Sequence, residues 1–198
     1  MLCYHSRKRN QKNKITLKEK IFKIIRQLLT IWGGISLLGL ILIGGYLGYS
    51  MTLANKNIED KATKSDVRFV LNWCELGDER IEKVNKSYTS GRSFTGDHFD
   101  AYSIKISNVT IDELEKQNNS TGQWYRCDSL PKILNDAVSF AGSWQHETPW
   151  FPTEKKIRTK DFYVYPWSIY CNGISPSGVQ LIFINPKEKT VYYIDAEM

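Results

Sequence analysis

The sequence predicts an α+β protein in which one transmembrane helix is followed by an exported antiparallel sheet domain with two or three helices packed on it. Three observations support this prediction. Positive charge is concentrated ahead of one long uncharged apolar stretch. Short segments that alternate between apolar and polar residues follow this stretch, separated by turn-forming residues. The chain shows neither strand–helix–strand alternation nor a repeat of fixed period.

The positive charge of the chain lies in its first residues. Nine of the 27 lysines and arginines fall within residues 1–26, where Glu19 is the single acid, so this segment has a net charge of +8. The rest of the chain holds 18 basic and 20 acidic side chains and has a net charge of −2. Nucleic-acid binding requires positive charge on the folded domain, so we expect no nucleic-acid partner.

The stretch between Arg26 and Lys56 contains no charged residue and predicts a transmembrane helix over residues 28–50. As a helix, residues 28–49 would be about 33 Å long, which is enough to cross a hydrocarbon core about 30 Å thick. Cations ahead of a span stay inside, so we expect a cytoplasmic tail and a periplasmic or extracellular C-terminal domain. The short basic anchor and sparse cysteines are typical of a bacterial inner-membrane protein, with the lipid bilayer as one partner.

A cleaved signal peptide is the alternative interpretation of the same stretch. A cut after Ala54, with Thr52 and Ala54 as the small residues, fits the cleavage pattern. The apolar run is longer than the about 7–15 residues of a typical signal sequence, and a basic leader of about 26 residues precedes it. Both features favour an anchor that the mature protein keeps.

Residues 1–27 form the basic tail, which ends in an amphipathic juxtamembrane segment. One side of its helical wheel is apolar and the other is charged. The apolar residues are Leu17, Ile21, Ile24, Ile25 and Leu28, and the charged ones are Glu19, Lys20, Lys23 and Arg26. The pattern is typical of a helix lying in the membrane interface, and equally of a cytosol-facing extension of the transmembrane helix.

Gly44 and Gly48 form a G-x-x-x-G pattern inside the predicted span, and Thr52 extends the same spacing. Small residues at this interval let two helix backbones approach closely, so a homodimer through Gly44 and Gly48 is one hypothesis. The alternative is that glycine is simply common in membrane helices.

After the span, residues 51–64 predict a stalk and residues 65–198 the exported α+β domain. Capping residues and apolar periodicity predict helices over residues 65–76, 110–116 and 129–142. Alternating segments predict strands over residues 81–88, 99–106, 162–165, 168–171, 179–184 and 190–194. We expect an antiparallel sheet of about four to six strands, with the helices mainly on one face.

The chain contains four cysteines. Cys3 lies in the tail and is expected to stay reduced, whereas Cys74, Cys127 and Cys171 lie where disulfides form. We predict a bridge between Cys127 and Cys171, which would close a loop of about 44 residues and stabilise the domain by about 2–4 kcal/mol. Cys74 is expected to be a buried apolar side chain. No C-x-x-C motif supports a redox site or a zinc ribbon.

Asp97, His98 and Asp100 are the candidates for catalysis, because two carboxylates beside an imidazole can bind a metal or transfer protons. In an extended segment His98 and Asp100 share one face and Asp97 lies on the other, so the three cannot all converge. The alternative is a loop end whose carboxylates bind nearby backbone amides. We therefore predict no bound metal and no cofactor.

Aromatic residues are concentrated in the second half of the domain. Trp144, Trp150 and Phe151 lie in a connection that Pro149 and Pro152 hold extended, and we expect these three side chains to form a binding face at the surface. Core filling is the alternative explanation for most of the aromatic residues.

No nucleophile-elbow, zinc-protease, phosphate-binding or dinucleotide-binding motif is present. The sequence therefore favours a single-pass membrane-anchored, non-catalytic interaction module that binds another envelope protein, of the accessory, assembly or immunity type. The alternative is a membrane-anchored hydrolase that uses Asp97, His98 and Asp100.

Overall fold

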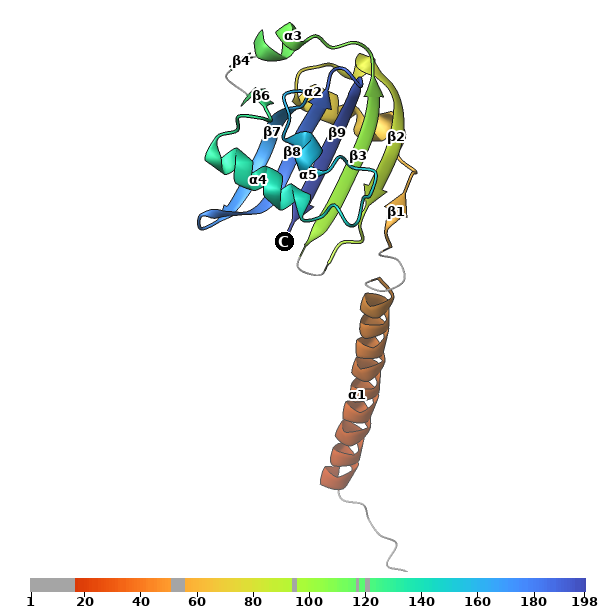
Figure 1. Ribbon diagram of the computed structural model, residues 1–198. Helices are drawn as coiled ribbons and strands as arrows, with labels where there is room; N and C mark the ends of the chain where they lie inside the picture. Colours follow the sequence, from red (N-terminus) through yellow and green to blue (C-terminus); the bar gives the residue numbers. More distant parts are fainter. Residues whose placement is uncertain (1–16, 51–55, 94–95, 117, 120–121) are drawn as a thin grey trace, which may run out of the picture. The chain divides into compact units, whose positions relative to one another are not determined.

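The computed structural model describes residues 17–50, 56–93, 96–116, 118–119 and 122–198 of the chain. The chain divides into two compact units, Met1–Ser50 and Met51–Met198. The first unit contains one long helix, and the second contains a sheet with its helices (Figure 1). Most of the predicted basic tail, including Cys3, and residues 51–55 of the predicted stalk lie outside the described residues.

Helix α1, Leu17–Tyr49, is one continuous α-helix of 33 residues. Its length and apolar composition are compatible with a membrane anchor or with a signal sequence. The helix runs past Arg26 without interruption, so the amphipathic segment directly continues the apolar helix. This is the geometry of a helical extension rather than of a separate helix lying across its end.

The second unit is built on an antiparallel sheet of seven strands in the order β1-β2-β3-β9-β8-β7-β6. The strands are β1 (Ile58–Glu59), β2 (Ile81–Thr89), β3 (His98–Ile106), β6 (Tyr125–Arg126), β7 (Tyr163–Asn172), β8 (Ser175–Asn185) and β9 (Thr190–Glu197). A separate two-stranded sheet pairs β4 (Asn118–Asn119) with β5 (Gly122–Gln123). The α+β class is confirmed, and the predicted strands over 162–165 and 168–171 form the single strand β7, with a bulge between Pro166 and Ser168.

Helices cover both faces of the sheet. Helix α4 (Lys132–Gly142) and α5 (Glu154–Ile157) lie on one face, and the 3-10 turn η2 (Ser65–Val67) with α2 (Arg68–Trp73) lies on the other (Figure 1). A further turn, η3 (Asp78–Arg80), and α3 (Ile111–Lys116) complete the helices. The expectation that the helices pack mainly on one face is wrong, because the central strands are apolar on both sides.

Strand alternation divides the core into two layers, one on each side of the sheet. The α4 face is defined by buried side chains that include Phe99, Phe151, Val164, Leu181, Phe183 and Ile194. The α2 face is defined by buried side chains that include Val70, Leu71, Ile104, Ile182, Val191 and Tyr193. Neighbours such as Ile182 and Phe183 are both fully buried but belong to opposite layers.

The end of the predicted stalk belongs to the sheet. Ile58 and Glu59 pair with Thr89 and Tyr88 of β2 and form the edge strand β1. Asp60 follows with a positive φ of 51°, and its carboxylate accepts hydrogen bonds from Lys86 Nζ at 2.6 Å and from the Ser87 backbone N–H at 3.2 Å. The predicted stalk therefore does not extend over all of residues 51–64. The sequence does not reveal this edge strand, because two residues are too few to show a periodicity.

Candidate functional site

Three titratable side chains meet on the α2 face of the sheet, where β3 and β9 are neighbours. His98 and Asp100 come from β3 and Asp195 from β9, and one nitrogen or oxygen atom of each lies within 4.8 Å of the other two. Within the described ranges this is the one group of three or more His, Cys, Asp or Glu side chains that lie so close together. We call it the His–Asp cluster.

The strand register brings these residues together. Asp100 lies directly opposite Asp195, and His98 lies opposite Glu197. Alternation places His98 and Asp100 on one face, while Phe99 between them is buried in the core of the α4 face. Like charges directly opposite each other across two strands destabilise a sheet, so a positive charge near this pair of carboxylates would stabilise it.

The ring of His98 is held in a defined orientation. Its side chain is only 10% exposed. Nδ1 donates a hydrogen bond to the carbonyl oxygen of Gly96 at 3.0 Å, and Gly96 adopts a positive φ of 100° that suits glycine. Glu197 Oε2 lies 3.8 Å from the same nitrogen. The other ring nitrogen, Nε2, therefore faces Asp195, whose Oδ1 is 3.3 Å away.

Asp195 is fixed by two donors on its other oxygen. Its Oδ2 accepts hydrogen bonds from Gln180 Nε2 at 3.0 Å and from the Tyr193 hydroxyl at 3.2 Å. Burial, together with the charge of Asp195, raises the pKa of the Tyr193 phenol, so this hydroxyl stays a donor at neutral pH. Oδ1 of Asp195 is left to face His98.

Asp100 is in a less favourable environment. Its Oδ1 is buried and receives no hydrogen bond. Burial and then the charge of Asp195 raise the pKa of Asp100, against the lowering effects of His98, Arg92 and Thr89. The Arg92 guanidinium is 4.0 Å from Asp100 Oδ2, and its own side chain is 65% exposed. Asp100 therefore has one carboxylate oxygen without a hydrogen bond and, on the other, only a long ion pair with an exposed arginine.

Asp97 lies outside the His–Asp cluster. Its backbone N–H donates to Ser93 Oγ at 2.8 Å, and its carbonyl oxygen accepts from the Ser93 backbone N–H at 3.0 Å, which closes the loop before β3. The structure thus brings together His98 and Asp100, as the alternation predicts, and supplies Asp195 as the third group. Sequence reasoning missed Asp195 because no local pattern shows that β9 pairs with β3.

Aromatic rings separate the His–Asp cluster from the core under α2. Tyr102 and Tyr193 stack with centroids 5.8 Å apart, and Phe69 contacts Tyr193 edge-on at 5.4 Å. A cavity of about 190 Å³ lies nearby, lined by Ile58, Lys61, Ala62, Asp66, Ser87, Thr89 and Tyr102. It is smaller than the about 300–1,000 Å³ of typical ligand pockets, and its lining includes no member of the cluster.

The structure places Trp144, Trp150 and Phe151, the expected aromatic binding face, against the core of the α4 face. Phe151 is 6% exposed and contacts Phe183 and Tyr192 edge-on at 6.1 and 5.5 Å. Trp144 stacks on Phe99 at 5.4 Å, and Trp150 is partly buried against the same core. The connection closes the α4 face beside α4, so core filling accounts for these three side chains.

Exposed apolar side chains lie instead along β7 and at the end of the hairpin that β7 forms with β8. We call this group the hairpin patch; its members are Trp167 (42% exposed), Tyr170 (52%), Ile174 (93%) and Met198 (62%). Trp167 stacks on Trp73 of α2 with centroids 4.6 Å apart and planes 4° from parallel. The backbone N–H of Met198 donates to the Ser177 carbonyl at 2.9 Å, which holds the C-terminus beside the hairpin (Figure 1).

The predicted Cys127–Cys171 disulfide is not formed. Cys74, Cys127 and Cys171 are all free, and Cys171 is the exposed one. The backbone N–H of Cys127 donates to the carbonyl oxygen of Phe162, directly before β7, whereas Cys171 pairs with Pro176 at the far end of β7. Nine residues of extended chain separate these positions by about 30 Å, and a disulfide needs Cα atoms within about 7 Å. Burial raises the pKa of both the Cys74 and Cys127 thiols to about 12.

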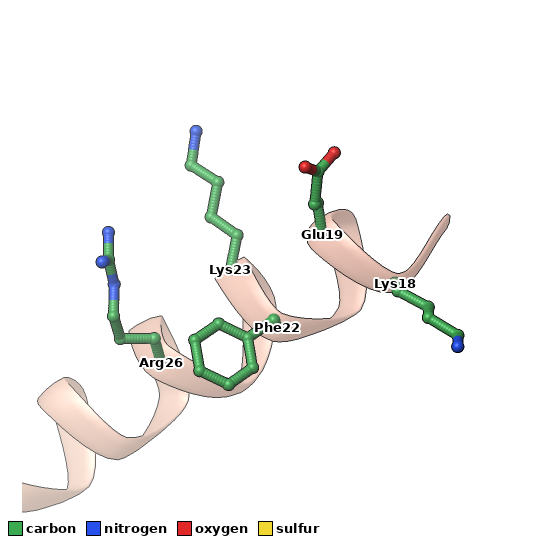
Figure 2. Close-up of a pocket in the computed structure, with 5 residues that line it drawn as sticks. All are labelled: Lys18, Glu19, Phe22, Lys23 and Arg26. Carbon is green, nitrogen blue, oxygen red and sulfur yellow. The ribbon is translucent and has the colours of Figure 1, made fainter. Parts of the chain in front are cut away.

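The residues of α1 after Leu17 that the sequence analysis named are exposed. Figure 2 shows Lys18, Glu19, Phe22, Lys23 and Arg26 on the first turns of α1, beside a surface hollow that all five line. Every lining residue comes from this one helix, so the hollow has no second wall. A Cβ atom added at Gly44 or Gly48 would meet nothing within 4 Å, so both positions are open to a second helix.

The chemistry available to the sheet unit is therefore of two kinds. The His–Asp cluster offers one imidazole nitrogen and two carboxylate oxygens, which are groups that bind a proton or a cation. The hairpin patch offers apolar and aromatic surface. Comparison of the chain with protein-family models, with curated proteins and with solved structures found no match.

Proposed function

We propose that this chain is a single-pass, membrane-anchored binding module whose sheet domain holds another envelope protein without catalysing a reaction. The observation that supports it best is the concentration of exposed apolar side chains in the hairpin patch. Among the described residues of the sheet unit, seven large apolar side chains are exposed, and four of them form the patch. Exposed apolar side chains concentrated in one hairpin are typical of protein-interaction sites, whereas single exposed residues scattered over a surface are ordinary.

The edge of the sheet beside the patch supports binding of an extended segment. Strand β6 pairs only with Tyr163 and Val164 of β7. In the part of the chain that the structure describes, the outer edge of β7 from residue 166 to 172 has no neighbouring strand. An exposed edge accepts a strand from a partner through backbone hydrogen bonds, and flanking pockets and side chains give specificity. Trp167 and Tyr170 lie on this edge strand and supply the side-chain contacts.

The charge asymmetry of the chain supports the anchor and its orientation. Residues 1–26 carry a net charge of +8 directly before the uncharged part of α1. We propose that this segment stays in the cytoplasm, that α1 crosses the inner membrane, and that the sheet domain lies on the periplasmic or extracellular side. Pairing of two copies through Gly44 and Gly48 remains a prediction.

Site-specific photo-cross-linking of the full chain in native membranes tests the proposed partner. A photoreactive phenylalanine analogue at Tyr170 is expected to yield one discrete adduct with an envelope protein. The change Ile174→Asp is expected to reduce the adduct at least tenfold, because it places a charge in the apolar contact. Ile133 on α4, which is 45% exposed, is the matched control position and is expected to give no discrete adduct. Equal adducts from Tyr170 and Ile133 would contradict the proposal.

A membrane-anchored hydrolase is the second candidate, and the convergence of His98, Asp100 and Asp195 favours it. General acid–base catalysis uses such groups when a substrate can reach them. The nearby cavity of about 190 Å³ does not include them in its lining, so the observations support binding better than catalysis. Hydrolysis by the full chain of a panel of ester, amide and phosphate substrates, lost in His98→Gln, would reverse this order.

A further inference from the structure

We propose that the His–Asp cluster binds a divalent cation of the zinc class through His98 Nε2 and one carboxylate oxygen from each of Asp100 and Asp195. The site is separate from the hairpin patch and does not depend on the partner proposed there. One imidazole and two carboxylates suit the borderline first-row divalent cations. All three ligands lie on paired strands of the sheet, so the backbone fixes their spacing.

The hydrogen bonding of His98 leaves a lone pair facing a carboxylate. A carbonyl oxygen only accepts, so Nδ1 must carry the proton that it donates to Gly96. In a neutral ring, Nε2 is then an acceptor that faces another acceptor, Asp195 Oδ1, at 3.3 Å. Two acceptors at this distance repel each other, so a proton or a metal cation has to lie between them. A histidine that ligates a metal commonly donates its other N–H to a backbone carbonyl in this way.

The distances suit a small cation. Zinc bonds to histidine nitrogen and carboxylate oxygen are about 2.0–2.2 Å long, so two ligand atoms of a tetrahedral site lie about 3.3 Å apart. His98 Nε2 and Asp195 Oδ1 are separated by that distance. The three ligand atoms lie within 4.8 Å of one another, so the third ligand needs to approach by up to about 1.5 Å, which side-chain rotation of Asp100 allows.

The buried oxygen of Asp100 favours a metal ion over a proton as the positive group between His98 and Asp195. Buried polar atoms normally have a hydrogen-bond partner, and Asp100 Oδ1 has none. A proton on His98 Nε2 would bridge to Asp195 but would leave Asp100 Oδ1 unsatisfied. A divalent cation between the strands coordinates both carboxylates and removes their mutual repulsion.

A second layer of contacts orients the ligands. Gln180 and Tyr193 hold Asp195 Oδ2, and Gly96 holds His98 Nδ1. Groups of this kind fix the ligands before the metal arrives, and changing one typically weakens metal binding about 10–100-fold.

The test uses the full chain in detergent, first stripped of metal with a chelator. Cys3→Ser and Cys171→Ser are introduced first, so that neither the tail thiol nor the exposed thiol binds the probe metal. Zn²⁺ alone is titrated while the unfolding temperature of the sheet domain is followed. We expect saturable binding of one equivalent and an unfolding temperature raised by about 5 °C or more at a hundredfold excess over Kd. Co²⁺ in place of Zn²⁺ is expected to give a visible absorption band from coordination by the protein.

The variants His98→Gln and Asp195→Asn are expected to abolish both responses, and Gln180→Ala to weaken binding about 10–100-fold. His146→Gln is the matched control. His146 Nε2 also lies 3.3 Å from a carboxylate oxygen, that of Glu147, but the pair is exposed and has no third ligand. This variant is expected to bind Zn²⁺ as the parent chain does.

The variant Asp100→Asn distinguishes loss of the metal site from a general loss of stability. In chelator it is expected to unfold at a higher temperature than the parent, because one of the two facing charges is gone. With Zn²⁺ it is expected to gain little or nothing. The proposal is overturned if Zn²⁺ gives the parent no saturable shift, or if the shift and the Co²⁺ band persist in folded His98→Gln.

Discussion

The two faces of one sheet differ in what their side chains do. On β3 the neighbours His98 and Phe99 point in opposite directions, one into the His–Asp cluster and the other into an apolar core where Trp144 stacks on it. On β9 the same holds for Ile194 and Asp195. The α4 face is closed by α4, α5 and the connection between them. The α2 face is closed over only part of its length, and its remainder carries the polar cluster.

The difference shows how one set of strands serves stability on one side and chemistry on the other. Because side chains of a strand alternate between the two faces, adjacent residues can have different roles without a change in the backbone. Phe183 on β8 is fully buried against Phe151, whereas Gln180 on the same strand donates to Asp195. A change on the α4 face should therefore cost folding free energy, and a change in the polar part of the α2 face should alter binding with little loss of stability.

The largest expected effect is on the α4 face. Phe183→Ala is expected to lower the free energy of unfolding by about 3–5 kcal/mol, because it leaves a cavity in a filled core. Gln180→Ala, on the same strand but on the other face, is expected to cost no more than about 1.5 kcal/mol, the usual value of one hydrogen bond. Denaturant unfolding of the full chain in detergent measures both. Equal losses of unfolding free energy in the two variants would show that the two faces do not differ in this way.

Thiol reactivity tests whether the cores of both faces are closed. Cys127 belongs to the core of the α4 face and Cys74 to that of the α2 face, while Cys171 is exposed. At pH 7 Cys171 is expected to react with an alkylating reagent at least about a hundredfold faster than either, because burial raises the pKa of the other two thiols to about 12. Peptide mapping by mass spectrometry gives the three rates. Fast modification of Cys74 alone would show that the α2 face opens readily.

The smallest expected effect is an electrostatic one on the α2 face. Burial and the charge of Asp195 raise the pKa of Asp100, so the folded chain resists its ionisation. This destabilising contribution is absent at low pH and appears as the pH rises from about 4, the ordinary pKa of an aspartate, through the raised value. In chelator at pH 7, Asp100→Asn is expected to be more stable than the parent by about 0.2–1 kcal/mol.

Unfolding of the two chains at several pH values measures this advantage. The difference between Asp100→Asn and the parent is expected to vanish below about pH 4, where Asp100 is protonated in both states of the parent. An advantage that is the same at pH 3 and pH 7 would show that packing, and not the facing charges of Asp100 and Asp195, is responsible.

The sequence determined those features that depend on residues close together in the chain. The long apolar helix, the strands β2, β3, β8 and β9, and the common face of His98 and Asp100 all follow from local periodicity, which a helix or strand imposes on its own residues. The uneven distribution of charge also follows directly from the sequence.

Only the tertiary structure decided which distant residues meet. The pairing of β9 with β3 brings Asp195 to His98 and Asp100, and no pattern within either segment specifies that register. The same reason explains the errors at Cys127, Cys171, Trp144 and Phe151, whose surroundings are set by strand length and by how a connection folds back onto the sheet. Local pattern fixes the direction of a side chain, whereas its neighbours depend on contacts between segments far apart in the chain.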